Sequence, residues 1–201
     1  YSPFLLQGGL ELPDRDYYLS PAPRMAEIRA KYQTYIAKIL ELGGVADAQP
    51  KAARIFALEK KIAAVHASRE DTEDVRKGNN HWATKDLASR APGLDWSAFF
   101  GAAGLDKQAG FVVWQPRALT GIAALVQSQP LASWKEYLAF HAFERHKSVL
   151  PKAFVNASFA FYGTALSGTL QQQERWKRAV AQTDDALGEV VGKLYVARYF
   201  P

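Results

Sequence analysis

The sequence has no cysteine, which excludes disulfides, thiolate zinc sites and cysteine nucleophiles. Its longest apolar stretches fall far below the ~20 residues that a membrane span needs, so we expect no membrane span in this segment. The net charge is +5, yet the basic residues are scattered and form no long run. Scattered charges are typical of solvated helix faces rather than of a nucleic-acid-binding stripe, so we expect no nucleic-acid partner.

What the sequence has in quantity is apolar and aromatic side chains. Hydrophobic residues make up 48% of the 201 residues, and there are five Trp, nine Tyr and eleven Phe. Aromatic side chains bury the largest area per residue, so they are expected to anchor the contacts between helices. The length fits one large domain or part of a larger protein.

Residues 1–22 are interrupted by breakers of regular structure: Gly8, Gly9, Pro13 and Pro21. Because proline disfavours helix before it, we predict an extended N-terminal arm over 1–22 and a helical domain over 23–201. The chain opens on Tyr1 rather than Met, and we expect any signal peptide to lie upstream of it.

Within the arm, the segment Arg15-Asp16-Tyr17-Tyr18 is the best candidate for a role beyond packing, since polar and aromatic loop residues often serve binding. We favour a structural role instead. In that interpretation Arg15 and Asp16 anchor the arm through ion pairs, and the two tyrosines pack against helices.

Apolar residues recur at three- and four-residue steps over most of the remaining sequence, which predicts helices. The expected segments are 24–42, 47–67, 84–90, a short helix after Asp95, one that begins at Pro116, 131–150, one after Pro151, and a last helix with Thr169 and Gln172 at capping-box spacing. Phe111–Trp114 is the only strand-like run. The expected fold class is all-α, a multi-helix domain of antiparallel packed helices with an extended N-terminal arm and little or no sheet.

Two of these helices carry specific predictions. In 131–150 the expected buried face consists of Trp134, Tyr137, Leu138, His141 and Ala142. In the last helix the expected stripe consists of Trp176, Val180, Thr183, Leu187, Val191 and Leu194, and Gly188 and Gly192 lie one turn apart on one face. Glycines at that spacing favour a close helix crossing, because each costs about 1 kcal/mol in a helix without such a reason.

The histidines do not form a metal-binding pattern. His141 and His146 are five residues apart and diverge by ~140° on a helix, whereas helical ligands need a spacing of three or four. Glu144 is within three residues of His141, but a third ligand is missing. We therefore expect His141 to line the edge of the core and His146 to be exposed.

Other catalytic patterns are also missing from the sequence. It has no G-x-S-x-G elbow and no glycine-rich phosphate loop, and the adjacent Asp184 and Asp185 face different ways on a helix. We predict no catalytic and no metal-binding residue in this chain, and we assign no substrate-binding residue.

Seven segments are similar, in order, to stretches of one enzyme family: Gly9–Leu19, Ala57–Ala63, Leu94–Trp96, Trp134–Leu138, Leu166–Gly168, Arg175–Lys177 and Leu187–Val196. Together they resemble the N-terminal region of the neprilysin and endothelin-converting-enzyme family of zinc metalloendopeptidases, including its G-L-G-L-P-x-R-D-Y-Y stretch. The resemblance covers essentially the whole chain, and the absence of cysteine favours a bacterial member. Glu11 stands where the family usually has Gly, a departure that we expect to have little effect.

The resemblance implies that the catalytic parts lie elsewhere. The family's H-E-x-x-H helix, its downstream Glu ligand and its N-A-x-Y segment are C-terminal to this region, and none of them occurs between Tyr1 and Pro201. Zn²⁺ would therefore be bound by the parent enzyme with ligands outside 1–201. The implied partners are the C-terminal catalytic domain of the same polypeptide and peptide substrates, and the implied location is the bacterial periplasm or the extracellular space.

For this region the resemblance implies a helical lid that caps the active-site cavity and limits the size of the peptides that enter. Two alternatives stay open. One is a stand-alone helical module that binds peptides or a protein, and the other is an inactive relative whose partner domain has lost its zinc ligands. If the chain is part of a larger enzyme, it should expose an apolar patch and self-associate when isolated.

Overall fold

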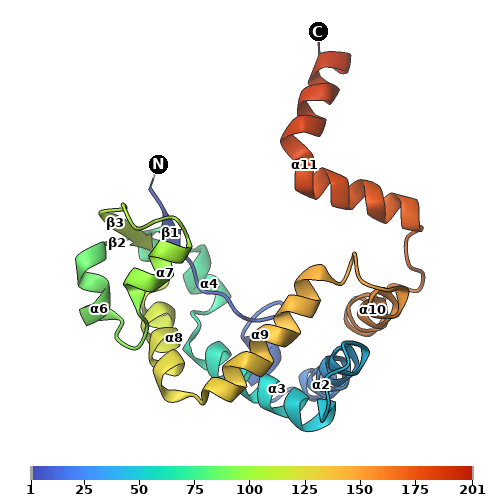
Figure 1. Cartoon of the computed structure of the whole chain (residues 1–201), viewed down its shortest axis with the longest axis horizontal. Helices are drawn as coiled ribbons and strands as arrows, with labels where there is room; N and C mark the ends of the chain where they lie inside the picture. Colours follow the sequence, from blue (N-terminus) through green and yellow to red (C-terminus); the bar gives the residue numbers. More distant parts are fainter. Residues whose placement is uncertain (1, 201) are drawn as a thin grey trace.

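A computed structural model describes residues 2–200, which form a mainly helical fold with a small sheet (Figure 1). The longer helices are α2 (Pro23–Leu42), α3 (Ala48–Val65), α8 (Pro116–Ser128), α9 (Leu131–His146) and α11 (Arg175–Tyr199). The shorter ones are α1 (Asp16–Leu19), α4 (Arg69–Glu73), α5 (Val75–Gly78), η1 (Thr84–Asp86), α6 (Leu87–Arg90), α7 (Trp96–Ala102), α10 (Lys152–Ser158) and η2 (Phe159–Leu166). The predicted helical fold class is confirmed.

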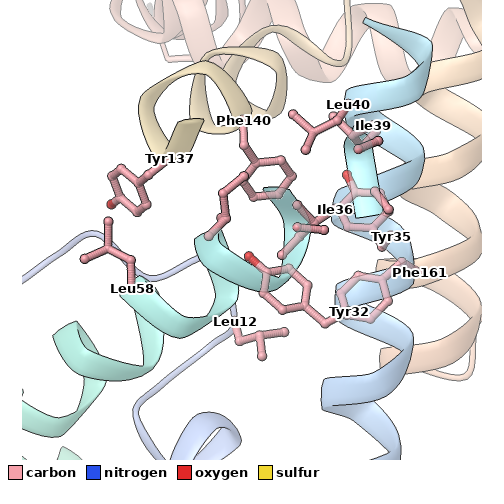
Figure 2. Close-up of a cluster of buried hydrophobic side chains, with 14 of the residues drawn as sticks. Leu12, Tyr32, Tyr35, Ile36, Ile39, Leu40, Leu58, Tyr137, Phe140 and Phe161 are labelled. Atoms are coloured by element: carbon pink, nitrogen blue, oxygen red, sulfur yellow. The ribbon is translucent and has the colours of Figure 1, made fainter. Parts of the chain in front are cut away.

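The main core lies between α2 and α3, which are joined by a short turn. The apolar face of α2 is buried, with Tyr32 and Ile36 fully enclosed, and Ile55 and Ile62 of α3 lie opposite. Phe140 of α9 completes the cluster (Figure 2). Asp47, which precedes α3, has a positive φ of 52° and turns the chain back, so the two long helices pack along each other.

A second, smaller core lies under the sheet. The strands are β1 (Phe4–Leu5), β2 (Asn80–Ala83) and β3 (Gly110–Val113), in the order β1-β3-β2, with β1 parallel and β2 antiparallel to β3. The predicted strand-like run is thus the central strand. Its partners are too short to show a period-two pattern, which is why the sequence did not reveal them. Trp82, Trp96, Phe100 and Phe111 fill this core.

The N-terminal segment crosses between the two cores. Gln7 accepts a hydrogen bond from the backbone N–H of Ala67 (2.7 Å), and its own N–H donates to Gln115 (2.9 Å). Tyr137 donates to the carbonyl of Gly9 (2.9 Å). The segment is not extended throughout, because Asp16–Leu19 form α1.

The predicted buried face of α9 is partly wrong. Tyr137 and the partly buried His141 face inward, but Leu138 is 61% exposed, and Glu144 is buried instead. The inward stripe therefore follows i, i+4, i+7 through a charged residue. Hydrophobic periodicity does not mark such a position, because it scores Glu as a surface residue.

The last helix begins later in the sequence than predicted, and it is not packed against the rest of the described chain. It begins at Arg175, and Thr169 and Gln172 lie in the preceding loop. Its backbone bends at Leu187, and none of its residues is buried. Gly188 and Gly192 have no neighbouring atoms within 4 Å, so the predicted close crossing does not form within residues 2–200.

Gly93 provides a test of the packing in the second core. Its φ is +114°, and a Cβ there would lie 2.2 Å from the carbonyl oxygen of Ala123 in α8. We expect Gly93→Ala to lower the free energy of unfolding by at least about 2 kcal/mol, from backbone strain and this clash. The measurement is the urea midpoint by tryptophan fluorescence at sub-micromolar protein concentration.

The matched control is Gly101→Ala in α7, where nothing lies within 4 Å of the new methyl group. It should leave stability unchanged or raise it by up to about 1 kcal/mol, because Ala is the better helix former. Equal effects of the two substitutions would contradict the packing described for Gly93.

Candidate functional site: a buried carboxylate network

Glu59 of α3 is the most deeply enclosed charged residue of residues 2–200, with no exposed surface. Its Oε2 accepts hydrogen bonds from the hydroxyls of Tyr18 (2.9 Å) and Tyr32 (2.8 Å). Its Oε1 lies 2.9 Å from Nε2 of His141. A buried carboxylate is tolerated only when its oxygens have such partners, so α1, α2 and α9 each contribute one.

His141 joins this carboxylate to a second one. Its Nδ1 lies 3.4 Å from Oε2 of Glu11, on the opposite side of the ring from Glu59. The ring also lies against Tyr137, with centroids 4.1 Å apart. The helical spacing that separates His141 from His146 leaves the latter exposed, where Nδ1 contacts only the carbonyl of Ala142 (2.9 Å).

The network continues to Glu144, one turn further along α9. Tyr35 of α2 donates a short hydrogen bond to it, and Tyr162 donates from η2 at 3.2 Å. Lys147 forms an ion pair with it at 2.7 Å. Tyr162 also lies 3.3 Å from Glu11 and so connects the two carboxylates. Because η2 is a π-helix, its wider turn is a local irregularity of the kind that often re-aims side chains.

Burial and charge shift the titration of these groups in opposite directions. Burial raises the pKa of Glu59 and of Glu144, and their hydrogen bonds offset this only in part. For His141, burial alone would lower the pKa, but the hydrogen bonds and charges of Glu11 and Glu59 outweigh it and raise the pKa to about 9. Burial also opposes ionisation of Glu11, yet its bonds to His141 and Glu144 and the charge of Lys147 hold its pKa below the usual value.

The network does not fit a metal ion. Within residues 2–200, no three His, Cys, Asp or Glu side chains are grouped so that they could hold one. The reason is visible at His141, where Glu11 and Glu59 occupy opposite ring nitrogens and so cannot share an ion with that ring. Zinc needs its ligands to converge tetrahedrally at roughly 2.0–2.3 Å, which this arrangement cannot provide.

Two hollows of the described surface lie largely outside the network. One, of about 350 Å³, borders β2 and β3 and includes His81 and Trp82. The other, of about 340 Å³, lies between α2 and η2. Tyr35 is the one network residue that borders either of these two hollows. The hydrogen bonds and ion pairs of the network tie α1, α2, α3, α9 and η2 together.

The candidate segment Arg15–Tyr18 has the structural role that we favoured, with a different means of anchoring. Arg15 donates to the carbonyl of His66 (2.8 Å) instead of forming an ion pair, and Asp16 begins α1. Tyr18 is buried in the network, whereas Tyr17 is only partly buried. The predicted ion pairs of Arg15 and Asp16 are absent from the described residues, because Arg15 finds an unpaired carbonyl at the end of α3.

Sequence reasoning missed Glu59 and Glu11 as members of a site. Glu59 lies in the apolar face of α3, directly after Leu58, and this position was the available signal. Glu11 was expected to matter little, yet its side chain is only 23% exposed and contacts His141, Lys147 and Tyr162. No local pattern marks it, because its partners lie more than 100 residues away in the chain.

The network predicts a large effect from one hydroxyl group. The Tyr18 hydroxyl donates to Glu59 and accepts from the backbone N–H of Leu12 (3.0 Å). We expect Tyr18→Phe to lower the free energy of unfolding by about 1–3 kcal/mol, since it leaves buried polar groups unpaired. Chemical denaturation at sub-micromolar concentration measures it.

The adjacent tyrosine is the control. The hydroxyl of Tyr17 has no hydrogen bond within residues 2–200, so Tyr17→Phe should change stability by less than about 0.5 kcal/mol. If Tyr18→Phe lowered the free energy of unfolding no more than Tyr17→Phe, the Tyr18 hydroxyl would not be a structural part of the network.

Comparisons with known proteins identify the family of this chain. The model of the N-terminal domain of peptidase family M13 matches residues 1–201. An endothelin-converting enzyme homolog from Locusta migratoria is 26% identical over 96% of this chain and 28% of its own length. Neprilysin-3 from Drosophila melanogaster is 26% identical over 96% of this chain and 26% of its own length.

Solved structures agree with the sequence comparison. Zinc metalloprotease Zmp1 of Mycobacterium tuberculosis in its open state matches with a TM-score of 0.91 and 34% identity, over 96% of this chain and 30% of that one. Its inhibitor complex matches with a TM-score of 0.89 at the same identity and coverage. The chain thus spans well under a third of the length of these proteins. The resemblance stated from the ordered segments is confirmed: the chain belongs to peptidase family M13 and corresponds to its N-terminal domain.

Proposed function

We propose that this chain is the helical N-terminal part of a zinc metalloendopeptidase that hydrolyses short peptides. The observation that carries the proposal is the family match over all 201 residues, together with the likeness to a zinc metalloprotease at a TM-score of 0.91. In this proposal the zinc ligands and the catalytic groups belong to a catalytic domain outside residues 1–201.

The helical body has the properties that a size-limiting lid requires. Its aromatic core joins α2, α3, α9 and η2, and the buried carboxylates are held by donors from several elements. A rigid body can exclude folded proteins from a cavity by its shape alone, without contacting a particular sequence. The likeness to both the open and the inhibitor-bound structure supports a body that keeps its shape.

The outward face of α11 is where we place the contact with the catalytic domain. Its exposed apolar side chains include Trp176, Val180, Leu187, Val190, Leu194, Tyr195 and Tyr199. The helix stands away from the rest of the chain (Figure 1). Many exposed large apolar side chains on one helix favour an interaction site there.

The location of the protein belongs to the same proposal. We place it in the bacterial periplasm or outside the cell, on the strength of its family resemblance. Among the helices of residues 2–200, none has the length and apolar character to cross a bilayer.

The test of the enzymatic proposal uses the complete reading frame that encodes residues 1–201. We expect the purified product to contain about one zinc per chain by metal analysis and to cleave a quenched fluorescent peptide. A chelator should abolish cleavage, and added zinc should restore it. A product without zinc and without hydrolysis would instead support an inactive relative.

The size limit is tested separately with one cleavable sequence in two settings. We expect a free peptide of about ten residues to be cleaved, and the same residues in a surface loop of a folded protein to resist cleavage by at least about 100-fold. The physical reason is steric exclusion from a closed cavity. An unfolded variant of the carrier protein controls for the local sequence. Equal cleavage of both substrates would contradict the size-limiting lid, but it would not contradict the proposal of a zinc endopeptidase.

The exposed face of α11 predicts how residues 1–201 behave alone. We expect the isolated chain to self-associate in analytical ultracentrifugation, because apolar side chains of α11 remain in water. Leu194→Lys should reduce the association, since Leu194 is 68% exposed on this face. Leu138→Lys is the control, because Leu138 is also an exposed leucine (61%) but lies on α9, a different helix. A monomer that binds peptides would favour the stand-alone binding module.

A further inference from the structure

Glu11 lies where the N-terminal segment meets two other elements. Its Oε2 is 3.4 Å from Nδ1 of His141 on α9, and its Oε1 accepts from the Tyr162 hydroxyl of η2 at 3.3 Å. Lys147 lies 4.0 Å away. The side chain is 23% exposed, so water screens these contacts only in part. One carboxylate therefore holds the segment against both α9 and η2.

The geometry around His141 favours a protonated ring. Each ring nitrogen faces a carboxylate, Nδ1 toward Glu11 and Nε2 toward Glu59. An ionised carboxylate can only accept hydrogen bonds, and a neutral imidazole has a single N–H to donate. Only the imidazolium form can donate to both, and it also balances part of their negative charge.

Other titratable groups lie near His141 on the same helix and just beyond its end. They are Tyr137, which lies against the ring, and Glu144 with its ion-pair partner Lys147. Burial raises the pKa of Tyr137, so this hydroxyl stays neutral at the pH values at which His141 titrates. Lys147 faces both Glu11 and Glu144, at 4.0 and 2.7 Å.

The remaining neighbours belong to α1, α2 and η2. Tyr18 and Tyr32 donate to Glu59, and Tyr35 and Tyr162 donate to Glu144. Burial raises the pKa of each of these four hydroxyls. These hydroxyls therefore stay neutral at the pH values at which His141 titrates.

We propose that Glu11 and His141 form a proton-dependent clasp that fastens residues 9–12 of the N-terminal segment to α9, and that the segment loosens when His141 loses its proton. The inference is independent of zinc and of peptide hydrolysis, because every group in it belongs to residues 2–200. Neighbouring contacts limit the loosening to this stretch: Gln7 remains bound to Ala67, and Arg15 to His66.

The direction of the pH dependence follows from the two shifts. The pKa of His141 is about 9 in the folded chain, above its ordinary 6.5, so its contribution is complete below 6.5 and is lost as the pH rises through about 9. The pKa of Glu11 is lowered from 4.5, so its contribution is complete above 4.5 and is lost as the pH falls through the lowered value. The clasp is strongest between these limits.

Hydrogen–deuterium exchange of the full-length protein tests the clasp directly. Peptides that cover residues 9–14 report the backbone N–H of Leu12, which donates to Tyr18 at 3.0 Å. Protection factors, corrected for the intrinsic rate at each pH, are compared near pH 6.5 and one unit above the His141 pKa of about 9. We expect protection in this stretch to fall by about tenfold or more at the higher pH, while peptides from α2 change much less.

Glu11→Gln removes the charge and keeps the size of the side chain. We expect it to reduce protection at neutral pH and to cut the pH-dependent change to less than about threefold. The control is Glu136→Gln, which breaks the ion pair with Arg54 (2.7 Å) and so also affects α3 and α9. This control should retain the wild-type pH dependence.

A second measurement does not depend on how the variants fold. NMR of ¹³C-labelled histidine in the wild-type protein should show one ring titrating near the pKa of about 9 that burial and the two carboxylates give His141, and His141→Gln assigns it. A His141 midpoint near the ordinary 6.5, or a protection that does not change with pH, would overturn the proposal. A Glu11→Gln variant with the full wild-type pH dependence would overturn it as well.

Discussion

The charge of Glu59 is the constraint on which the rest of this domain depends. Its carboxylate has no exposed surface, and moving such a group out of water costs several kcal/mol unless both oxygens are paired. The pairing groups come from α1, α2 and α9, which are far apart in the sequence. Those three elements must therefore be placed correctly around α3 at the same time, whereas an apolar core of similar size would tolerate small slides between them.

The same requirement spreads outward from Glu59. His141 needs a second acceptor for its other nitrogen, and Glu11 supplies it. Glu11 in turn shares Tyr162 with Glu144, whose other partners are Tyr35 and Lys147. Each buried polar group is satisfied by one that itself needs a partner, so the network ends only where Lys147 and Glu11 reach partial exposure. Such a chain of contacts specifies one arrangement of the helices more strongly than it adds net stability.

Sequence patterns predicted the helices well and the network poorly, for one physical reason. The stripe on α2 and the apolar face of α3 were visible because burial of apolar residues follows the helical period. Leu138 was placed on the wrong side, and Glu144 was left out of the buried face, because that period treats a carboxylate as a surface group. The spacing of His141 and His146 alone argued against a metal-binding pair. It did not reveal the carboxylate partners of His141, because Glu11 and Glu59 become its neighbours only after the chain folds.

Helix α11 differs from the other long helices in its exposure to water. In the other long helices the aromatic residues are at least partly buried, but α11 has no buried residue over its whole length. A helix of this kind gains most of its stability from packing of its apolar face, and little from propensity alone. The relatives are more than three times as long as this chain, so the catalytic domain of the proposed enzyme would be the partner for α11. In the proposed enzyme, the Glu59 network would hold the helical body in one shape, and the exposed apolar side chains of α11 would make its contact with the catalytic domain.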